Sequence, residues 1–452
     1  MRLLVISLVL VVGPFAVGCD SNCGDDACLF TMTEWNTVKT LSPLPDPPPD
    51  PTNRFSQDPA AATLGHKLFV ETRYSTALKV GSTLGVVGDP AKVGCVSCHL
   101  APDFVDTRSS PNNLSVGVSW TTKNAPSLVN NVYYRWHNWH GNRSTLWDQA
   151  SFSPETGTNT AGDRCGYAHM LWDLYREEYN AVFAETPLSD RLAKDAADPI
   201  PLKCKPKSSA TAADGPWELF AAADEAAGRA PDFTQNTVLQ IMCNQGKAVA
   251  AFESQLVSRN APFDQYIAGD EAAISEQAKR GLRLFVGKAA CVNCHSGPFF
   301  SDQLFHNIGI AQTGPNVPAM DQGRIEGIKD PPKSPCRPNG PFSDDPSVDW
   351  LDNLVQDNED DRGAFRTASL RNVANSAPYM HAGQLATLRD VLEYYNKGGD
   401  VTGFSGVKST RMRPLGLTES DIDALLAFLE TLTGEPIPSE LTTSPTLPVL
   451  PP

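Results

Sequence analysis

The sequence lacks three features, each of which would mark a different class of protein. Beyond the first 19 residues, no segment of the 452-residue chain is long and apolar enough to span a bilayer. Basic residues are in the minority, with 37 Lys and Arg against 52 Asp and Glu, and the net charge of -15 argues against a nucleic-acid-binding protein. No alternating strand pattern of convincing length occurs either. We therefore expect an all-α, acidic protein with long loops.

The one strongly apolar segment lies at the N-terminus and is typical of an export signal. Arg2 precedes an apolar run from Leu3 to Val12, and Ala16-Val17-Gly18-Cys19 resembles a bacterial lipobox. We expect residues 1–19 to be a lipoprotein-type signal and Cys19 to carry a lipid that anchors the chain to a membrane. An ordinary cleaved signal is the alternative. Both predict a location in the periplasm or cell envelope.

Composition divides the rest of the chain into a linker, two domains and a tail. Residues 20–55 are polar and then Pro-rich, which predicts an extended linker. We expect domains at 56–265 and 266–435, and a disordered tail at 436–452. Apolar residues at helical spacing predict a helix that begins at Ala60 and further helices at 166–183, 238–257, 272–286, 387–396 and 418–432.

Two pentapeptides share one pattern, Cys95-Val96-Ser97-Cys98-His99 and Cys291-Val292-Asn293-Cys294-His295. Two thiols at this spacing lie on one side of a helical turn and can both bond a porphyrin edge, and the following His offers an imidazole to the iron. The alternatives are a redox Cys pair beside an unrelated His, or a split zinc site. We expect two covalently bound c-type haems, with His99 and His295 as iron ligands.

The remaining cysteines allow disulfides, because an exported chain meets an oxidising environment. Apart from Cys19 and the four motif cysteines, six remain: Cys23, Cys28, Cys165, Cys204, Cys243 and Cys336. Three disulfides are possible, and proximity favours only Cys23 with Cys28. A local repeat precedes the two pentapeptides, since Leu64-Gly65-His66-Lys67-Leu68-Phe69 is similar to Arg280-Gly281-Leu282-Arg283-Leu284-Phe285, which predicts a duplicated domain.

Several further blocks surround the second pentapeptide. They are Ser296-Gly297-Pro298-Phe299-Phe300, Phe305-His306-Asn307-Ile308-Gly309, the segment from Phe365 to Ala374, and Ala377-Pro378-Tyr379-Met380-His381-Ala382-Gly383. With two haem motifs in this order, the chain resembles the bacterial di-haem cytochrome c peroxidase family, which includes MauG, over about residues 60–435. The resemblance implies two all-α cytochrome c-like domains, each with one covalent haem, long loops and an oxidoreductase activity on hydrogen peroxide.

For the C-terminal haem, the resemblance implies a sixth ligand fourteen residues past the His of the Pro-Tyr-x-His block. Counting from His381 leads to Tyr395, where MauG also has Tyr and other members have Met. A phenolate is a hard anionic donor that stabilises ferric iron. The alternatives are Met380 or Met412 as ligand, with Tyr395 a core residue beside Tyr394.

For the N-terminal haem, the family places a distal His in the loop after the first motif. Residues 100–119 contain neither His nor Met. We therefore expect an iron that is five-coordinate or water-bound and able to meet hydrogen peroxide or oxygen, with His137 and His140 as less favoured ligands.

Three further residues match positions that matter for turnover. The resemblance implies that Trp139 relays an electron between the haems and that Gln149 is a distal amide. The family's distal Glu is replaced by Asn159, and an amide cannot act as a general acid or base. Glu155 is the expected substitute, with His169 as an outside possibility.

The family also holds a calcium ion between its domains. The matching positions are the side chain of Asn124 and the carbonyls of Ser376 and Pro378, and oxygen ligands of this kind suit calcium. Asn124 before Ala-Pro also fits a plain turn.

Three functions remain open from the sequence. The first is a peroxidase that takes electrons from a small cytochrome or cupredoxin. The second is a MauG-like oxidase that modifies a partner protein. The third is a non-catalytic, membrane-attached electron-transfer cytochrome, which the missing Glu favours.

Overall fold

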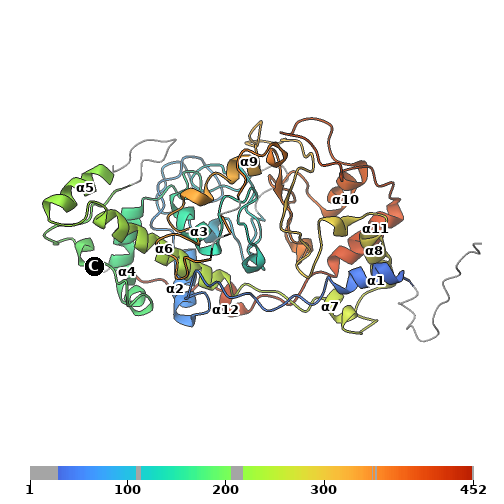
Figure 1. The fold of residues 1–452 in the computed structure, drawn as a ribbon, viewed down its shortest axis with the longest axis horizontal. Helices are drawn as coiled ribbons and strands as arrows, with labels where there is room; N and C mark the ends of the chain where they lie inside the picture. The colour runs from blue at the N-terminus through green and yellow to red at the C-terminus, as the bar shows by residue number, and fades with distance from the viewer. Residues whose placement is uncertain (1–28, 108–113, 205–216, 349, 352–353, 450–452) are drawn as a thin grey trace, which may run out of the picture.

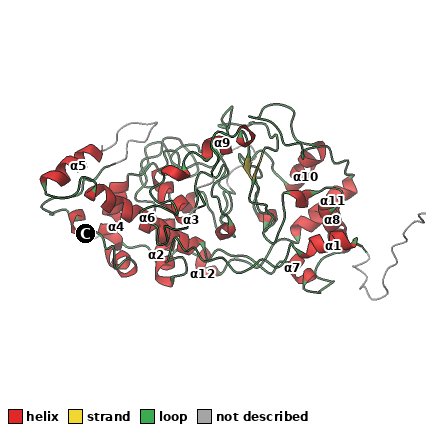
Figure 2. Cartoon of the chain, viewed as in Figure 1, coloured by secondary structure: helices red, strands yellow, loops and turns green. Residues whose placement is uncertain are grey.

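The computed structural model describes residues 29–107, 114–204, 217–348, 350–351 and 354–449. Cys19, Cys23 and Cys28 lie outside these ranges. The described chain is mainly helical, as expected, and its two short strands, β1 (Phe305–His306) and β2 (Phe365–Arg366), pair antiparallel with Phe305 opposite Arg366 (Figure 2). Within the described residues, no helix combines the length and apolar composition needed to cross a membrane.

The N-terminal lobe is built on five helices, which gather at one end of the molecule (Figure 1). They are α2 (Pro59–Val70), α3 (Leu146–Phe152), α4 (Arg164–Val182), α5 (Trp217–Ala226) and α6 (Phe233–Glu253). α2 begins where the Asp58 carboxylate accepts hydrogen bonds from the Ala60 and Ala61 amides, and Pro59 occupies the first turn, where no amide donor is needed.

The C-terminal lobe is built on α7 (Pro262–Ile267), α8 (Glu276–Val286), α9 (Arg324–Gly327), α10 (Leu388–Lys397) and α11 (Glu419–Glu430). Thr418 caps α11 in a reciprocal capping box with Asp421, as the sequence indicates. Short 3-10 turns join the helices, at Cys95–Ser97, Asn131–Tyr133, Ser153–Glu155, Asp190–Leu192, Cys291–Asn293, Pro331–Lys333, Glu359–Asp361 and Val373–Asn375.

The same glycine contact holds the main helix pair of each lobe. In the N-terminal lobe, a Cβ added to Gly65 of α2 would lie 1.9 Å from the Ala248 carbonyl oxygen of α6. In the C-terminal lobe, a Cβ added to Gly281 of α8 would lie 1.9 Å from the Ala424 carbonyl oxygen of α11. Both glycines occupy the same place in the local repeat. The backbones of each pair can therefore approach more closely than any side chain would permit.

Phenylalanine rings extend this equivalence into the two cores. The Phe69 ring centroid lies 5.2 Å from that of Phe252, and the Phe285 centroid lies 5.2 Å from that of Phe428. Both pairs are tilted, a favoured aromatic geometry. The two lobes share one helix-and-ring scaffold, which supports the predicted duplication; the exact domain boundaries remain a prediction.

The segment expected to be a linker packs instead of running free. Its described part includes α1 (Met32–Lys39), which begins with a Thr31–Glu34 capping box. Val38 and Leu41 are buried in the core of the C-terminal lobe. The chain then runs to the N-terminal lobe, where the Trp147 indole donates a hydrogen bond of 2.9 Å to the Thr52 hydroxyl. The prolines keep this segment extended, and the residues around them pack against both lobes.

The segment expected to be a disordered tail also packs, over its described residues 436–449. It contains α12 (Ser439–Thr442), and Ile437 is buried in the core of the N-terminal lobe. The Arg73 guanidinium donates a hydrogen bond of 2.8 Å to the Pro448 carbonyl. Each end of the described chain therefore packs on the lobe that lies farther from it in sequence (Figure 1).

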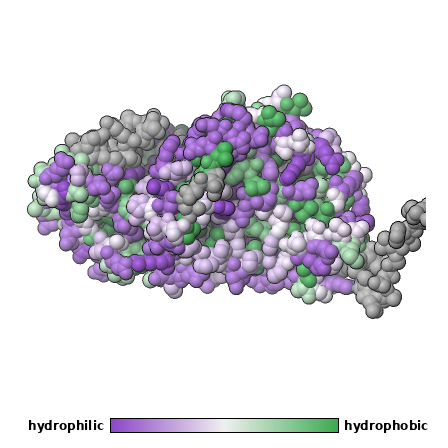
Figure 3. All heavy atoms as spheres, viewed as in Figure 1, coloured by the Kyte–Doolittle hydropathy of each residue, from purple (hydrophilic) through white to green (hydrophobic). Residues whose placement is uncertain are grey.

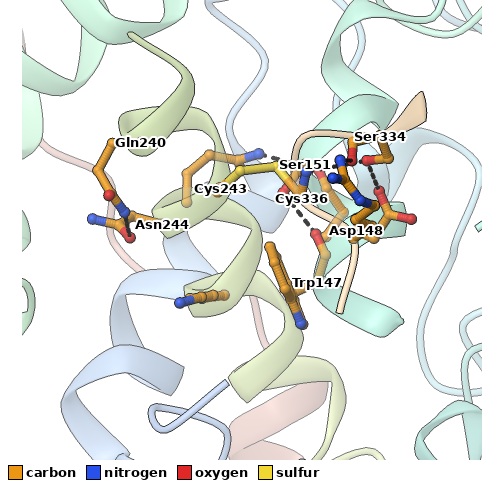
Figure 4. Close-up of a disulfide and its surroundings, with 12 residues drawn as sticks. Trp147, Asp148, Ser151, Gln240, Cys243, Asn244, Ser334 and Cys336 are labelled. Atoms are coloured by element: carbon orange, nitrogen blue, oxygen red, sulfur yellow. Dashed lines mark hydrogen bonds between the residues drawn. A yellow bond between two sulfur atoms is a disulfide. The ribbon is translucent and has the colours of Figure 1, made fainter. Parts of the chain in front are cut away.

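Two disulfides form within the described residues, Cys165 to Cys204 and Cys243 to Cys336. The second joins α6 to a loop that follows α9, as Figure 4 shows. Beside it, the Ser334 hydroxyl donates a hydrogen bond of 2.5 Å to the buried Asp148 carboxylate of α3. The loop of the C-terminal half is thus fixed covalently to the N-terminal lobe. The face of the molecule seen in Figure 3 is mainly hydrophilic, in keeping with its net charge.

Gly281→Ala tests the helix contact. We expect it to lower the free energy of unfolding by about 1–3 kcal/mol, because the new methyl group overlaps the Ala424 carbonyl. Denaturant unfolding followed by circular dichroism measures this change. Gly157→Ala is the matched control, since a Cβ there has no atom within 4 Å. Equal stability of the two variants would contradict the proposed close contact.

Candidate functional site

The first pentapeptide follows α2 and is wound into the 3-10 turn at Cys95–Ser97. The His99 amide donates a hydrogen bond of 3.0 Å to the Cys95 carbonyl, which extends the turn to the His. The His99 Nδ1 atom lies 3.3 Å from the Phe104 carbonyl oxygen. An Nδ1 atom that donates to a carbonyl leaves Nε2 as the nitrogen that can bind a metal.

The second pentapeptide repeats this arrangement after α8. The His295 amide donates to the Cys291 carbonyl at 2.9 Å, and the His295 Nδ1 atom lies 3.1 Å from the Phe300 carbonyl oxygen. Phe104 and Phe300 each follow their His by five residues, and both have a left-handed backbone, with φ of 49° and 51°. Both imidazoles are therefore oriented by the same local turn.

The four motif thiols are the only cysteines of the described residues that form no disulfide. Burial raises the pKa of Cys95 and of Cys291 to about 12. For Cys294, burial is outweighed by hydrogen bonds from His306 and Arg411, which lower its pKa. Unpaired thiols beside an oriented imidazole fit the covalent attachment of a haem.

A cavity of about 510 Å³ opens beside the second pentapeptide. Cys291, Cys294 and His295 line it, and so do Tyr395, Met380 and Met412, which include every sixth ligand considered from the sequence. Tyr395 comes from α10, and burial raises the pKa of its hydroxyl. The size of the cavity and its mainly apolar lining fit a cofactor site, and its donor set fits a haem.

Trp139 belongs to a loop of the N-terminal half, yet it forms part of the wall of this cavity. Its indole Nε1 donates a hydrogen bond of 2.7 Å to the Asn124 carbonyl, and its own carbonyl accepts one of 2.8 Å from the Arg366 amide of β2. The indole plane is therefore fixed between the two halves of the chain.

The three residues matched to calcium lie on the wall of the same cavity. The Asn124 amide nitrogen Nδ2 lies 3.5 Å from the Pro378 carbonyl, while its Oδ1 accepts a hydrogen bond of 2.9 Å from the Ser115 hydroxyl. Asn124 and Pro378 are thus brought together. A cation between them would require the amide to turn so that its oxygen faces Pro378, and the Ser115 hydroxyl could then accept from the nitrogen.

Comparison with known proteins agrees with this geometry. The family model described as di-haem cytochrome c peroxidase matches residues 59–198. The cytochrome-c peroxidase IdrP1 of Denitromonas iodatirespirans is 31% identical over 403 residues, which cover 87% of this chain and 86% of the relative. IdrP2 of the same organism is 36% identical over 387 residues, 85% of this chain and 84% of the relative. This chain belongs to the di-haem cytochrome c peroxidase family.

Other members of the family match as well. The methylamine utilization protein MauG of Methylorubrum extorquens is 40% identical over 189 residues, 42% of this chain and 44% of its own length. The diheme peroxidase BthA of Burkholderia thailandensis has the same fold, with a TM-score of 0.56 at 20% identity over 88% of this chain and 93% of its own. The predicted family is therefore confirmed, together with its oxidoreductase class and covalently bound haems.

The distal residues expected from the family resemblance differ in how far other side chains already engage them. Gln149 lies half-buried on α3. Both oxygens of Glu155 accept hydrogen bonds from the largely buried Arg164, at 2.7 Å from Nε and 2.5 Å from Nη2. The backbone carbonyl of Asn159 accepts a hydrogen bond of 2.6 Å from the Val118 amide. Both oxygens of Glu155 are therefore already occupied by Arg164.

The other three histidines considered from the sequence differ in their surroundings. The His169 Nε2 atom lies 2.9 Å from the Ile200 carbonyl, so this residue has a structural partner. Burial lowers the pKa of His137 and of His140 to about 3, so both rings stay neutral at ordinary pH. His140 in addition packs against α9, where a Cβ on Gly327 would lie 2.2 Å from its carbonyl.

Sequence reasoning missed other side chains at these sites. Arg366 lies on the cavity wall, with its guanidinium carbon 3.4 Å from the centre of the Tyr134 ring. His306 lies 2.7 Å from the Asp302 carboxylate; hydrogen bonds to Asp302 and Cys294 raise its pKa to about 9. The blocks that contain Arg366 and His306 were recognised from the sequence, but nothing in their spacing indicated these contacts.

Proposed function

We propose that this protein reduces hydrogen peroxide with electrons from a small redox protein, a cytochrome or a cupredoxin. The supporting observation is an asymmetry between the two sites. Tyr395 lines the cavity of His295, whereas the loop after His99 carries neither His nor Met in its sequence. Peroxide therefore reacts at the N-terminal site, and the C-terminal site stores and relays electrons.

The chain attaches the haems, orients them and leaves one site open to peroxide. Cys95, Cys98 and His99 hold one haem, and the second pentapeptide holds the other. When bound, a haem supplies one-electron redox chemistry and, where a position on the iron is open, a site for peroxide. Gln149 is the proposed hydrogen-bond partner of the peroxide. Each turnover takes two electrons from the donor protein and two protons from solvent, and forms two molecules of water.

Trp139 is the proposed relay between the two sites. Its place on the cavity wall, its hydrogen bond to Asn124 and its backbone link to Arg366 hold the indole in one orientation. A fixed, oxidisable ring at the junction of two redox sites shortens each electron-transfer step. Residues of both halves of the chain therefore take part in one reaction.

Glu155 is the proposed proton carrier, and both of its oxygens are paired with Arg164. This feature, together with Tyr395, supports a second candidate function, a MauG-like oxidase that modifies a partner protein at low turnover. A basic partner surface would suit the net charge of -15. Membership of a family of enzymes disfavours the third possibility, a non-catalytic electron-transfer cytochrome.

The proposed location is the periplasm or cell envelope. Lipid attachment at Cys19 remains a prediction, because this residue lies outside the described residues. We also propose a calcium ion held by the Asn124 side chain and the carbonyls of Ser376 and Pro378, with water completing the shell. Because the Asn124 carbonyl also holds the Trp139 indole, such an ion would set the geometry of the relay.

Tyr395→Phe tests the axial ligand. We expect the visible and EPR spectra of the oxidised protein to change, because a phenolate donor is lost. Tyr394→Phe is the matched control, since its hydroxyl hydrogen bonds to the Ile308 carbonyl at 3.0 Å and not to the site. If Tyr395→Phe leaves both spectra unchanged, Tyr395 is not the ligand, and the same spectra of Met380→Leu and Met412→Leu identify the alternative.

Trp139→Phe tests the relay and the overall function. We expect peroxide-dependent oxidation of a reduced small cytochrome to slow by about tenfold or more, a barrier increase of about 1.4 kcal/mol. Trp136→Phe is the control, because Trp136 is buried against Arg324 and does not line the cavity. If the wild-type protein consumes no peroxide, the proposed function is wrong. If peroxide is consumed while the cytochrome stays reduced, the oxidase of a partner protein is favoured.

Calcium removal tests the proposed cation. We expect chelation to lower the peroxidase rate and added calcium to restore it, because the ion positions the loop that holds Trp139. Asn124→Asp keeps an oxygen ligand and should retain calcium in elemental analysis of the dialysed protein, whereas Asn124→Ala should lose it. A wild-type protein that carries no calcium and is indifferent to chelation would rule the site out.

A further inference from the structure

Three tyrosines of the N-terminal lobe form a series that begins beside the first pentapeptide. Tyr74 follows α2, and its hydroxyl lies against the Cys95 sulfur, close enough to hydrogen bond to it. Its ring packs edge-on against Tyr167 of α4, with the centroids 4.8 Å apart. Cys95 is one of the two sulfurs that attach the haem. Tyr74 is therefore next to an atom that is covalently joined to the haem.

Tyr167 is followed eight residues later by Tyr175 on the same helix. Eight residues span about 12 Å along a helix axis. Tyr167 is buried and donates a hydrogen bond of 3.3 Å to the Gln245 side-chain oxygen. Tyr175 is buried as well, and its hydroxyl donates a hydrogen bond of 2.6 Å to Oε2 of Glu71. A separation of about 12 Å is within the range of a single electron-transfer step.

Glu71 is an ionised, fully buried base at the end of this series. Its Oε1 accepts from the Thr72 and Arg73 amides at 2.9 and 2.8 Å, and the Arg73 guanidinium pairs with both of its oxygens. Burial acts to raise the pKa of Glu71, but the hydrogen bonds from Arg73 and Tyr175 outweigh it. Arg73 itself is partly exposed, which brings the series to the protein surface.

Packing alone gives no reason for three hydroxyl groups here. A buried hydroxyl costs free energy unless it is hydrogen-bonded, and Phe would fill the same space without this need. Each hydroxyl has its own acceptor, and only that of Tyr175 is a carboxylate. A phenol is oxidised at moderate potential only when its proton leaves with the electron. Tyr175 is therefore the position at which an oxidising equivalent would come to rest.

We propose that Tyr74, Tyr167 and Tyr175 form a relay that carries an oxidising equivalent from the N-terminal haem site to Tyr175 when no donor protein is bound. The relay rests on the proposed function, which supplies peroxide as the oxidant. The Tyr175 O–H bond breaks, its proton passes to Oε2 of Glu71, and its electron passes through the other two rings to the oxidised site, which is reduced by one electron. Tyr175 is left as a neutral phenoxyl radical.

The radical is then repaired at the surface. A small one-electron reductant of the ascorbate class, which arrives beside the partly exposed Arg73, returns an electron to Tyr175. The proton held by Glu71 returns to the phenol oxygen at the same time. The relay thus protects the N-terminal lobe by moving the oxidation to a defined residue, which is buried but separated from the surface only by Glu71 and the partly exposed Arg73.

Freeze-quenched EPR tests the relay on the full-length protein with its haems attached. The oxidised protein is mixed with a stoichiometric amount of hydrogen peroxide without a donor, and peroxide consumption is measured in the same samples. We expect a tyrosyl radical in the wild type and its loss in Tyr175→Phe. Tyr179→Phe should keep it, since Tyr179 is buried on the same helix but accepts a hydrogen bond of 2.9 Å from Asn244 and faces no carboxylate.

A second variant addresses the proton acceptor. Glu71→Gln keeps the shape of the side chain but removes its charge, and we expect the radical to be lost although Tyr175 is intact. Circular dichroism and haem absorbance establish that each variant is folded. A radical that persists unchanged in Tyr175→Phe, or no radical in a wild type that consumes peroxide, overturns the relay alone. A wild type that consumes no peroxide overturns the proposed function and the relay with it.

Discussion

The contact between a glycine and a facing carbonyl is the constraint on which each lobe depends. Gly281 allows α8 to lie against α11, and this closeness brings Phe285 and Phe428 into ring contact. Phe300 packs on both rings, and its carbonyl accepts the hydrogen bond that orients His295. The imidazole that we propose as an iron ligand is therefore fixed through a short series of contacts that begins at a residue without a side chain.

The two lobes repeat this scaffold and differ in what their loops add to it. In the C-terminal lobe, α10 places Tyr395 on the wall of the cavity that His295 also lines. In the N-terminal lobe, the chain around the first motif adds tyrosines and the Glu155–Arg164 pair. A duplicated scaffold with different loops can hold two chemically similar cofactors at different tasks, because axial ligands and neighbouring charges set the behaviour of a haem.

The sequence predicted what depends on local spacing. The two haem motifs, the all-α class, the helix near 166–183, which is α4, and the cap at Thr418 all follow from residues close together in the chain. The sequence did not predict what depends on distant partners. The Cys243 to Cys336 disulfide joins residues 93 apart, and the packing of the linker and the tail depends on cores formed elsewhere. Likewise, the position of Glu155 in the sequence does not predict its ion pair with Arg164.

These distant contacts matter because they hold the two halves together around Trp139. The disulfide, the crossed ends of the chain and the link from Arg366 to Trp139 all join parts of the molecule that the haem motifs alone would leave independent. The proposed relay through Trp139 requires its distance to both sites to stay constant, since electron transfer weakens steeply with distance. The loop after His99 contains no His or Met, so the proposed peroxide site has no such ligand to displace. The contacts that hold the two halves together and the proposed open first site would therefore serve the same reaction.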